Sequence, residues 1–451
     1  MLGNELLVRL DSPAADETFS RLYGHEGVEA ARRRYKSLIK EFMRDSNDWF
    51  PRTEFPESAG ELRIFSAPGR TELGGNHTDH NRGKVLAASI QLDSVAIVAP
   101  RKDKKVFFRS IGHPDVVVDL SDLSMQPNEK GNTEALIRGI AAEFANRRKL
   151  VGGFSMNAGS QVLSGSGLSS SATVEVLFGR IFDCLYGDGK MSALEIAQIG
   201  QNAENNYFGK PCGLMDQTAC ASGGAVAIDF ENPIEPKLNQ IDFDLSSLGT
   251  ALCVVHTGGT HSDLTADYAA IPGEMKAVAA CLGKAFLREL DIKTILENAM
   301  EIRKKAGDRA LLRAVHFFNE NQRVDAMRKA LEEMNSSIFP EDSQRAFGVF
   351  LSQVNQSGDS SWEFLQNIYP PHNPKEQGIS LALALTKDFL DRFCRNQGAC
   401  RVHGGGFAGT IQAYIPMTAL ADYKKQVESF FGPNSVTVLS IRPVGVVELE
   451  F

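Results

Sequence analysis

Apolar residues in the first fifty positions recur at the spacing of helices rather than strands. They stand among many charged residues, at Phe19, Leu22, Tyr23, Tyr35, Leu38, Ile39 and Phe42. We therefore expect an N-terminal helical segment over 16–50. From Leu62 onward the chain alternates short apolar runs with glycine-rich segments. These runs predict a strand in IFSAPGR, a loop through GRTELGGNHTDHNRG, one or two strands in VLAASIQLDSVAIVAP, and further strands in VFFRS and VVVDL.

Helical patterns follow in the middle of the chain. An apolar face predicts a helix over 132–150, and a second one predicts a helix over 170–186, directly after a glycine and serine loop. Ser192 with Glu195 three residues later has the pattern of a capping box, so another helix should begin there and reach about Phe208.

A polar, proline-containing stretch at 230–244 marks the expected crossover between two domains. After it come a strand in ALCVVHT and several charged amphipathic helices. The chain closes with a helix at 380–396, a glycine loop, a strand, a helix at 417–431 and a last strand in VTVLSIR, which is a βαβ-like unit. We predict a helical extension at 1–60 packed on a first domain at 61–240, followed by a second domain at 241–451.

Composition narrows the class of protein. A length of 451 residues with 43% hydrophobic positions suits two domains with sizeable cores. The net charge of −8 argues against nucleic acid as a partner, because such binding needs clustered basic residues. The seven cysteines show no CxxC spacing, and the sequence shows neither a long apolar run nor a signal-peptide pattern. We expect a cytoplasmic protein with reduced thiols, either a monomer or a weak dimer, that does not bind membranes.

The segment SGSGLSSSA, at 164–172, combines glycines with the start of a predicted helix. Glycines let the backbone approach an anion, and the free N–H groups of the helix N-terminus point toward it. The pattern indicates a phosphate-binding loop, although a flexible surface loop with a serine-rich cap remains possible from these residues alone. It lacks the Lys of a Walker A loop, and Ser170 stands where a dinucleotide fingerprint needs its third glycine.

Four segments in order resemble one family. APGRTELGGNHTDHN, at 67–81, resembles the galactokinase signature GRxNLxGEHTDYN, and SGSGLSSSA resembles the second signature of the same GHMP kinase superfamily. AENNYFGKPCGLMDQ, at 203–217, resembles AExxFxGxxCGIMDQ, and RVHGGGFAG, at 401–409, resembles the C-terminal glycine motif. The resemblance implies a two-domain α+β fold, with a ribosomal protein S5 domain 2-like first domain, a ferredoxin-like second domain and the active site in the cleft between them.

The resemblance also implies roles for individual residues in transfer of the γ-phosphoryl group of ATP to the C1 hydroxyl of a sugar. Asp216 matches the catalytic carboxylate that accepts the hydroxyl proton, and Arg70 matches the arginine beside it. Ser171 and Glu204 match ligands of Mg²⁺, which prefers hard oxygen donors. The phosphate-binding residues would be Gly165, Ser166, Gly167, Leu168, Ser169, Ser170 and Ser171. The glycines at 404–406 would support the site from the second domain.

The sugar-binding positions implied by the resemblance are Asn76, His77, Asp79, Gly213 and Tyr268. Tyr268 is the loosest match, and a core aromatic is its alternative. A metal site at His77, Asp79 and His80 is disfavoured because no second set of ligands accompanies these residues.

The chain departs from the family pattern at the residue before His77, where Asn76 replaces a glutamate that receives the C6 hydroxyl of the sugar. Glu72 and His80 replace an asparagine and a tyrosine, and Leu163 replaces a proline. A neutral amide accepts a hydrogen bond from a hydroxyl but does not repel a C6 carboxylate. The family resemblance implies galactose as the substrate, and the amide at position 76 leaves galacturonate or L-arabinose as alternatives. A non-catalytic sugar and ATP sensor is a further alternative, disfavoured by the intact serines and Asp216.

Overall fold

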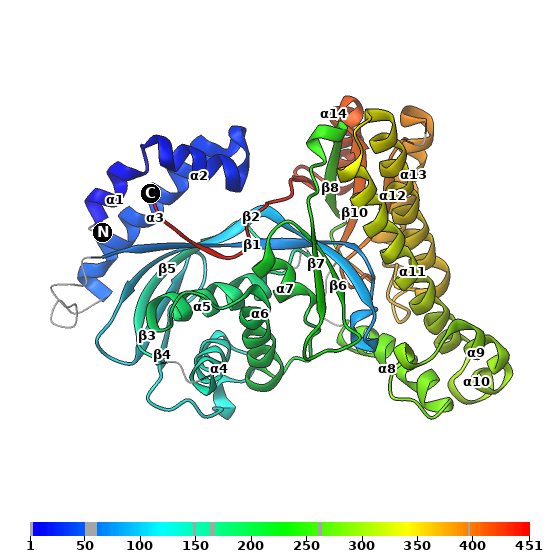
Figure 1. The fold of residues 1–451 in the computed structure, drawn as a ribbon, viewed down its shortest axis with the longest axis horizontal. Helices are drawn as coiled ribbons and strands as arrows, with labels where there is room; N and C mark the ends of the chain where they lie inside the picture. The colour runs from blue at the N-terminus through cyan, green and yellow to red at the C-terminus, as the bar shows by residue number, and fades with distance from the viewer. Residues whose placement is uncertain (1–2, 50–60, 148–149, 163–166, 260–263, 396) are drawn as a thin grey trace.

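The computed structural model describes residues 3–49, 61–147, 150–162, 167–259, 264–395 and 397–451. Two β-sheets lie side by side, and helices cover both faces of each (Figure 1). The chain is therefore a mixed α and β protein of two packed units, as the sequence predicts.

The larger sheet runs in the order β12-β1-β2-β5-β3-β4, and β6 and β7 extend it from the other half of β2. Its strands are β1 (Arg63–Gly74), β2 (Lys84–Pro100), β3 (Lys105–Ser110), β4 (Val116–Asp119), β5 (Phe154–Ser160), β6 (Ala225–Asp229), β7 (Lys237–Ile241) and β12 (Val447–Leu449). β1 is longer than predicted, because its pairing with β2 continues through two register shifts as far as Gly74. The predicted loop therefore begins only at Gly75.

The N-terminal segment forms the expected helices and covers one face of this sheet (Figure 1). They are α1 (Gly3–Arg9), α2 (Pro13–Tyr23) and α3 (Val28–Trp49). Phe19, Tyr35 and Ile39 are fully buried and pack with Ile97 and Leu449 of the sheet. This apolar contact holds the extension on the first unit.

The opposite face carries the helices that deliver the predicted motifs. They are α4 (Thr133–Asn146), α5 (Ser170–Tyr186), α6 (Ala193–Asn202) and α7 (Met215–Ser222). Ser192 and Glu195 form the predicted capping box, with the Ser192 hydroxyl accepting from the Glu195 amide at 3.2 Å. After α6 the chain continues as a π-helical turn, Ala203–Phe208, which contains Glu204.

The second sheet has the order β11-β8-β10-β9. Its strands are β8 (Thr250–His256), β9 (Ala399–His403), β10 (Thr410–Pro416) and β11 (Val436–Leu439), and the helices α13 (Gly378–Cys394) and α14 (Leu420–Phe431) cover one face. β8 pairs antiparallel with both β10 and β11. The predicted βαβ-like unit is therefore split by β8.

Two long helices, α11 (Asp308–Ser336) and α12 (Pro340–Ser360), cover the other face of the second sheet and share one apolar cluster with both sheets. Leu73 and Leu86 of the first sheet meet Met327 of α11 in that cluster. The shorter helices α8 (Thr265–Cys281), α9 (Ile292–Glu297) and α10 (Ala299–Ala306) pack at one end of α11. This shared core fixes the two units against each other.

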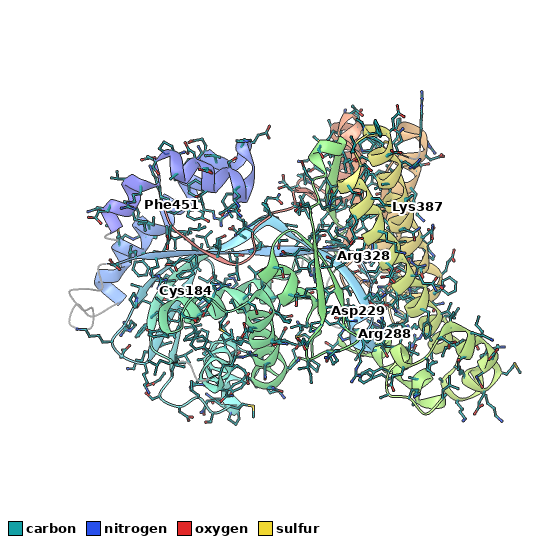
Figure 2. All side chains as sticks on the ribbon, viewed as in Figure 1. Cys184, Asp229, Arg288, Arg328, Lys387 and Phe451 are labelled. Carbon is teal, nitrogen blue, oxygen red and sulfur yellow. The ribbon has the colours of Figure 1, made fainter. Side chains whose placement is uncertain are left out.

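The end of the chain returns to the first sheet, which differs from the predicted second domain at 241–451. β12 pairs with β1, and the Arg9 guanidinium donates to the Phe451 carbonyl oxygen at 2.6 Å. The Phe451 ring lies 5.5 Å from that of Phe19, against the N-terminal helices (Figure 2). No helix in the described residues is long and apolar enough to cross a membrane.

Candidate active site

Asp216 and Arg70 form a two-pronged ion pair where β1 meets the first turn of α7. Arg70 Nε and Nη2 donate to the two carboxylate oxygens, each at 2.8 Å. The Arg70 side chain is 7% exposed, whereas that of Asp216 is 35% exposed. Burial opposes the charged guanidinium, yet the carboxylates of Asp216 and Glu72 raise the pKa of Arg70. The arrangement holds an accessible carboxylate in one orientation.

Arg70 also joins this pair to the predicted phosphate loop. Its Nη1 donates to the Gly167 carbonyl oxygen, and its backbone amide donates to the Leu168 carbonyl at 3.1 Å. Ser169 adopts a left-handed backbone with φ of 62° just before α5, and its hydroxyl donates to Asp216 at 2.5 Å. The sequence assigned Ser169 to phosphate, but here its hydroxyl faces the carboxylate.

The remaining phosphate-loop residues lie at the N-terminus of α5. Ser170 and Ser171 form its first turn, where free backbone N–H groups favour an anion. Leu168 is buried with an exposed fraction of 2%, so it contributes backbone rather than side chain. The predicted residues Gly165 and Ser166 lie outside the described residues.

Two buried carboxylates lie beside this helix start. The Ser171 hydroxyl donates to Glu175 at 2.7 Å, and the Gln217 amide donates to Glu175 at 2.9 Å and to Glu204 at 3.1 Å. Burial and the neighbouring Glu204 raise the pKa of Glu175 to about 8. Lys210 Nζ lies 3.2 Å from Glu204. This cluster brings a hydroxyl and two carboxyl groups together beside the first turn of α5.

A cavity of about 880 Å³ opens beside Asp216. Its lining brings together all the predicted catalytic and sugar-binding residues, namely Arg70, Asn76, His77, Asp79, Gly213, Asp216 and Tyr268. They come from β1, the loop after it, the segment before α7 and the start of α8. The sequence predicted that these separate segments meet in one place.

Two of the predicted sugar-binding residues, His77 and Tyr268, donate hydrogen bonds to backbone carbonyl groups of the glycine loop. His77 Nε2 donates to the Gly405 carbonyl oxygen at 2.9 Å, and burial lowers the pKa of His77 to about 3, so the ring is neutral. Tyr268 donates its hydroxyl to the Gly406 carbonyl at 3.1 Å. Within the described ranges, no three or more His, Cys, Asp or Glu side chains gather as a metal site.

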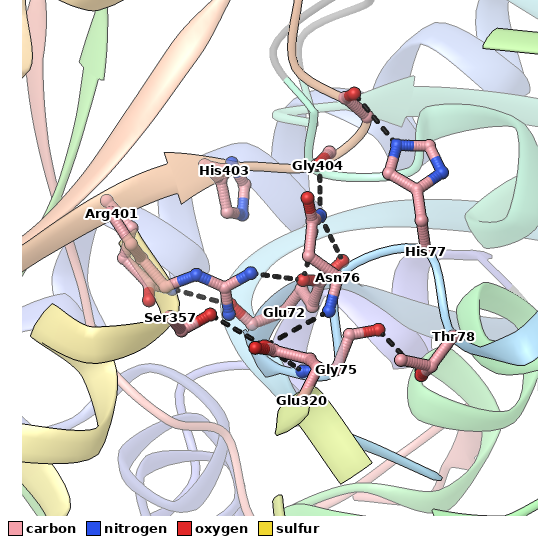
Figure 3. A network of polar contacts seen from close by, with 12 residues as sticks. Glu72, Gly75, Asn76, His77, Thr78, Glu320, Ser357, Arg401, His403 and Gly404 are labelled. Carbon is pink, nitrogen blue, oxygen red and sulfur yellow. Dashed lines mark hydrogen bonds and ion pairs between the residues drawn. The ribbon is translucent and has the colours of Figure 1, made fainter. Parts of the chain in front are cut away.

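Asn76 lines the cavity, but its side-chain amide is hydrogen-bonded at both ends to other protein groups. Its side-chain amide donates to the Gly404 carbonyl at 2.7 Å and to Glu72 at 3.1 Å. Its side-chain oxygen accepts from Asn367 at 2.9 Å (Figure 3). The residue is 1% exposed. A direct contact between the Asn76 side chain and a bound sugar would require breaking these bonds.

Helix α11 holds the backbone of the same loop from behind. Glu320 accepts from the Gly75 amide at 3.0 Å and from the Ser357 hydroxyl at 2.6 Å (Figure 3). His316 Nε2 donates to the Asn76 carbonyl at 2.9 Å. Gly75 has φ of 95°, and a Cβ there would lie 2.5 Å from the Lys84 carbonyl oxygen. The loop therefore has one tightly defined path.

Sequence reasoning missed Glu175, Gln217 and the support from Asn367. A signal for Glu175 existed, because it stands four residues after Ser171 and so lies on the same helix face. Gln217 directly follows Asp216 within a motif that was recognised. Asn367 carries no local signal, because it meets Asn76 across 291 positions of sequence.

Comparison with known families supports the motifs. Residues 135–224 match the family described as GHMP kinases N terminal domain, and residues 52–100 match the galactokinase galactose-binding signature. A galactokinase of Clostridium tetani is 28% identical over 383 residues, covering 82% of this chain and 88% of that protein. A galactokinase of Streptomyces coelicolor is 29% identical over 373 residues with the same coverage.

Solved structures share the fold. The Lactococcus lactis galactokinase complexed with galactose matches with a TM-score of 0.74 at 21% identity, covering 92% of this chain and all of that one. The Methanococcus jannaschii mevalonate kinase matches with a TM-score of 0.57 at 14% identity, covering 86% and 99%. The fold and the two family matches place the protein among the GHMP kinases. Within that class the chain carries the galactokinase galactose-binding signature and is similar over most of its length to galactokinases, which supports a sugar kinase.

Gly213 gives a direct test of the sugar side of the cavity. A Cβ at this position would lie 1.9 Å from Asp79 Oδ2, so Gly213→Ala must displace the Asp79 carboxylate. We expect the KM for the sugar to rise about 10- to 100-fold with the KM for ATP unchanged. Gly273→Ala is the matched control, because Gly273 also lines the cavity and a Cβ there meets no atom within 4 Å. An unchanged sugar KM in Gly213→Ala would remove Asp79 from the binding site.

Proposed function

We propose that the protein is an ATP-dependent galactokinase, which converts ATP and α-D-galactose into ADP and α-D-galactose 1-phosphate. The observation that carries the proposal is the Asp216 carboxylate, oriented by Arg70 in a cavity that also contains Asp79 and His77. The galactokinase relatives support the choice of substrate. The free thiols of all seven cysteines agree with a cytoplasmic location.

In this proposal Asp216 accepts the proton of the C1 hydroxyl as the sugar oxygen forms its bond to the γ-phosphorus. The bond from that phosphorus to the oxygen of the β-phosphate breaks, and ADP leaves. Arg70 orients the carboxylate and adds positive charge beside the transferred group. Because Arg70 also binds Gly167, one side chain aligns the base with the phosphate loop.

The nucleotide phosphates would bind at the N-terminus of α5, through the backbone of Gly167 to Ser171 and the preceding Gly165 and Ser166. The α5 dipole and free N–H groups supply positive potential there. This local field allows a protein with a net charge of −8 to bind a polyanion.

The donor set beside α5 fits Mg²⁺. Ser171, Glu175 and Glu204 offer hard oxygen atoms, and burial together with the nearby Glu204 raises the pKa of Glu175, a shift that a bound cation would oppose. We propose that Ser171 and Glu204 hold the ion, with Glu175 orienting the Ser171 hydroxyl. When bound, Mg²⁺ neutralises charge on the ATP phosphates.

Asp79 would accept hydrogen bonds from the ring hydroxyls of the sugar, with His77, Gly213 and Tyr268 completing the wall. We also propose that the chain is organised as an extension at 1–60 and two catalytic domains that meet near residue 240. The segment at 441–451 belongs with the first of these domains, since Ile441 bridges to Ile90 and β12 pairs with β1.

A substrate panel tests the function. The kcat/KM for ADP release should be highest with galactose and lower with galacturonate and L-arabinose. Absence of galactose turnover would overturn the choice of substrate, and turnover of galacturonate or L-arabinose instead would identify the alternative. Sugar and ATP binding without any turnover would make the protein a sensor.

A further inference from the structure

An acidic residue and an amide have exchanged places in the sugar-binding loop. The galactokinase pattern GRxNLxGEHTDYN has its amide where this chain has Glu72 and its carboxylate where this chain has Asn76. The two side chains contact each other, since the Asn76 amide donates to Glu72 Oε1 at 3.1 Å. Both are almost completely buried. We therefore treat the two departures from the family pattern as one coupled change at two residues in contact.

The charge of Glu72 is compensated by the second unit. Arg401 on β9 donates from Nη2 to Glu72 Oε1 at 2.5 Å, and the Arg401 side chain is fully buried. Arg401 Nε and Nη1 have no hydrogen-bond partner in the described part of the chain. The Arg401 guanidinium, drawn beside Glu72 in Figure 3, therefore has two donors available for a carboxylate at the neighbouring position 76.

Asn76 uses both ends of its amide for the framework. The nitrogen binds the Gly404 carbonyl as well as Glu72, and the oxygen accepts from Asn367. A carboxylate has no hydrogen to donate to the Gly404 carbonyl, and at position 76 it would stand against Glu72. The neighbouring Gly405 carbonyl is the acceptor for His77. Asn76 and His77 are therefore held by two adjacent carbonyl groups of the same glycine loop.

We propose that Glu72 and Asn76 act as one positioning pair, which locks the sugar loop to the glycine loop of the second unit through Arg401 and Gly404. In this arrangement the Asn76 side chain does not contact the sugar, and His77 and Asp79 make the contacts that select it. The inference rests on the proposed sugar site. It reverses the simple expectation that the family glutamate at position 76 would improve galactose binding.

An exchange experiment tests the pair. Asn76→Glu alone buries a second carboxylate and should raise the sugar KM about tenfold or more while leaving the ATP KM within about twofold. Glu72→Asn alone leaves Arg401 without its partner and should lower the melting temperature and raise the sugar KM. The double variant Glu72→Asn/Asn76→Glu should recover most of both losses, because Arg401 again meets one carboxylate beside one amide.

Two outcomes would overturn the proposal. One is an Asn76→Glu enzyme whose sugar KM is unchanged or lower, and the other is a double variant no better than the worse single one. Thr386→Val is the matched control, because it also removes a buried hydrogen bond. The Thr386 hydroxyl pairs with the Tyr423 hydroxyl at 2.9 Å in the core of the second unit. It should lower the melting temperature without moving the sugar KM.

Failure of the pair and failure of the proposed function are distinguishable. Melting temperatures of the four proteins of the cycle, measured without ligand, report the coupling between positions 72 and 76 whatever the substrate. Additive losses in that cycle would refute the pair. A wild-type enzyme that turns over no sugar would refute the function while the melting-temperature cycle still decides on the pair.

Discussion

Asp216→Asn should lower kcat by about 10²- to 10⁴-fold, because an amide cannot accept the proton of the sugar hydroxyl. The substitution keeps the size of the side chain, and its oxygen still accepts from Arg70, which now binds Asp216 at 2.8 Å. Sugar and ATP affinities should change little. The measurement is ADP release under saturating substrates, together with calorimetric binding of the sugar.

Asp229→Asn is the matched control, since Asp229 also pairs with an arginine, Arg288, at 2.9 Å but lies outside the cavity lining (Figure 2). It should retain normal kcat. A kcat for Asp216→Asn within tenfold of wild type would exclude Asp216 as the base. A loss of sugar binding equal to the loss of rate would instead make Asp216 a binding residue.

Asp93→Ala should cost about 3–5 kcal/mol of stability, because it leaves a buried arginine without its partner. Asp93 is fully buried, and Arg442 Nη1 lies 3.0 Å from its carboxylate. Arg34 pairs with the same carboxylate, and Tyr23 donates to it at 2.6 Å. Although burial alone would raise it, the two arginines lower the pKa of Asp93. One carboxylate thus joins the N-terminal helices, the first sheet and the end of the chain.

Urea unfolding with limited proteolysis of the N-terminal helices measures this effect. The helices should become cleavable in Asp93→Ala under conditions where wild type resists. Asp16→Ala is the control within the N-terminal helices. Asp16 pairs with Arg32 at an exposed site, so its loss should change the free energy of unfolding little. Equal stability of the two variants would show that the extension is held by apolar packing alone.

The parts predicted from sequence are those with a local signal. The helix Ser170–Tyr186 appears as predicted because its apolar stripe and preceding loop are continuous in sequence. The joint placement of Arg70 and Asp216 followed from motifs that the family resemblance connects. The sequence pattern did not predict that β1 extends to Gly74. The strand continues through register shifts that depend on its pairing with β2.

The orientation of Asn76 could not be predicted from the loop itself. It depends on Gly404 and Asn367, which arrive from distant parts of the chain. The burial of Glu72 likewise has no local signal, because its partner Arg401 lies 329 positions away in the sequence. Buried polar networks of this kind are properties of tertiary structure, and a linear pattern contains no measure of them.

The pairing of β12 with β1 bears on how the protein is made. The N-terminal helices are synthesised well before β12, yet one edge of β1 and the contact between the Phe19 and Phe451 rings are completed only after residues 447–451 have been made. The N-terminal helices therefore emerge first and finish docking last. A tag fused directly after Phe451 would lie beside these helices, and we expect it to disturb the packing of the first unit rather than that of the second.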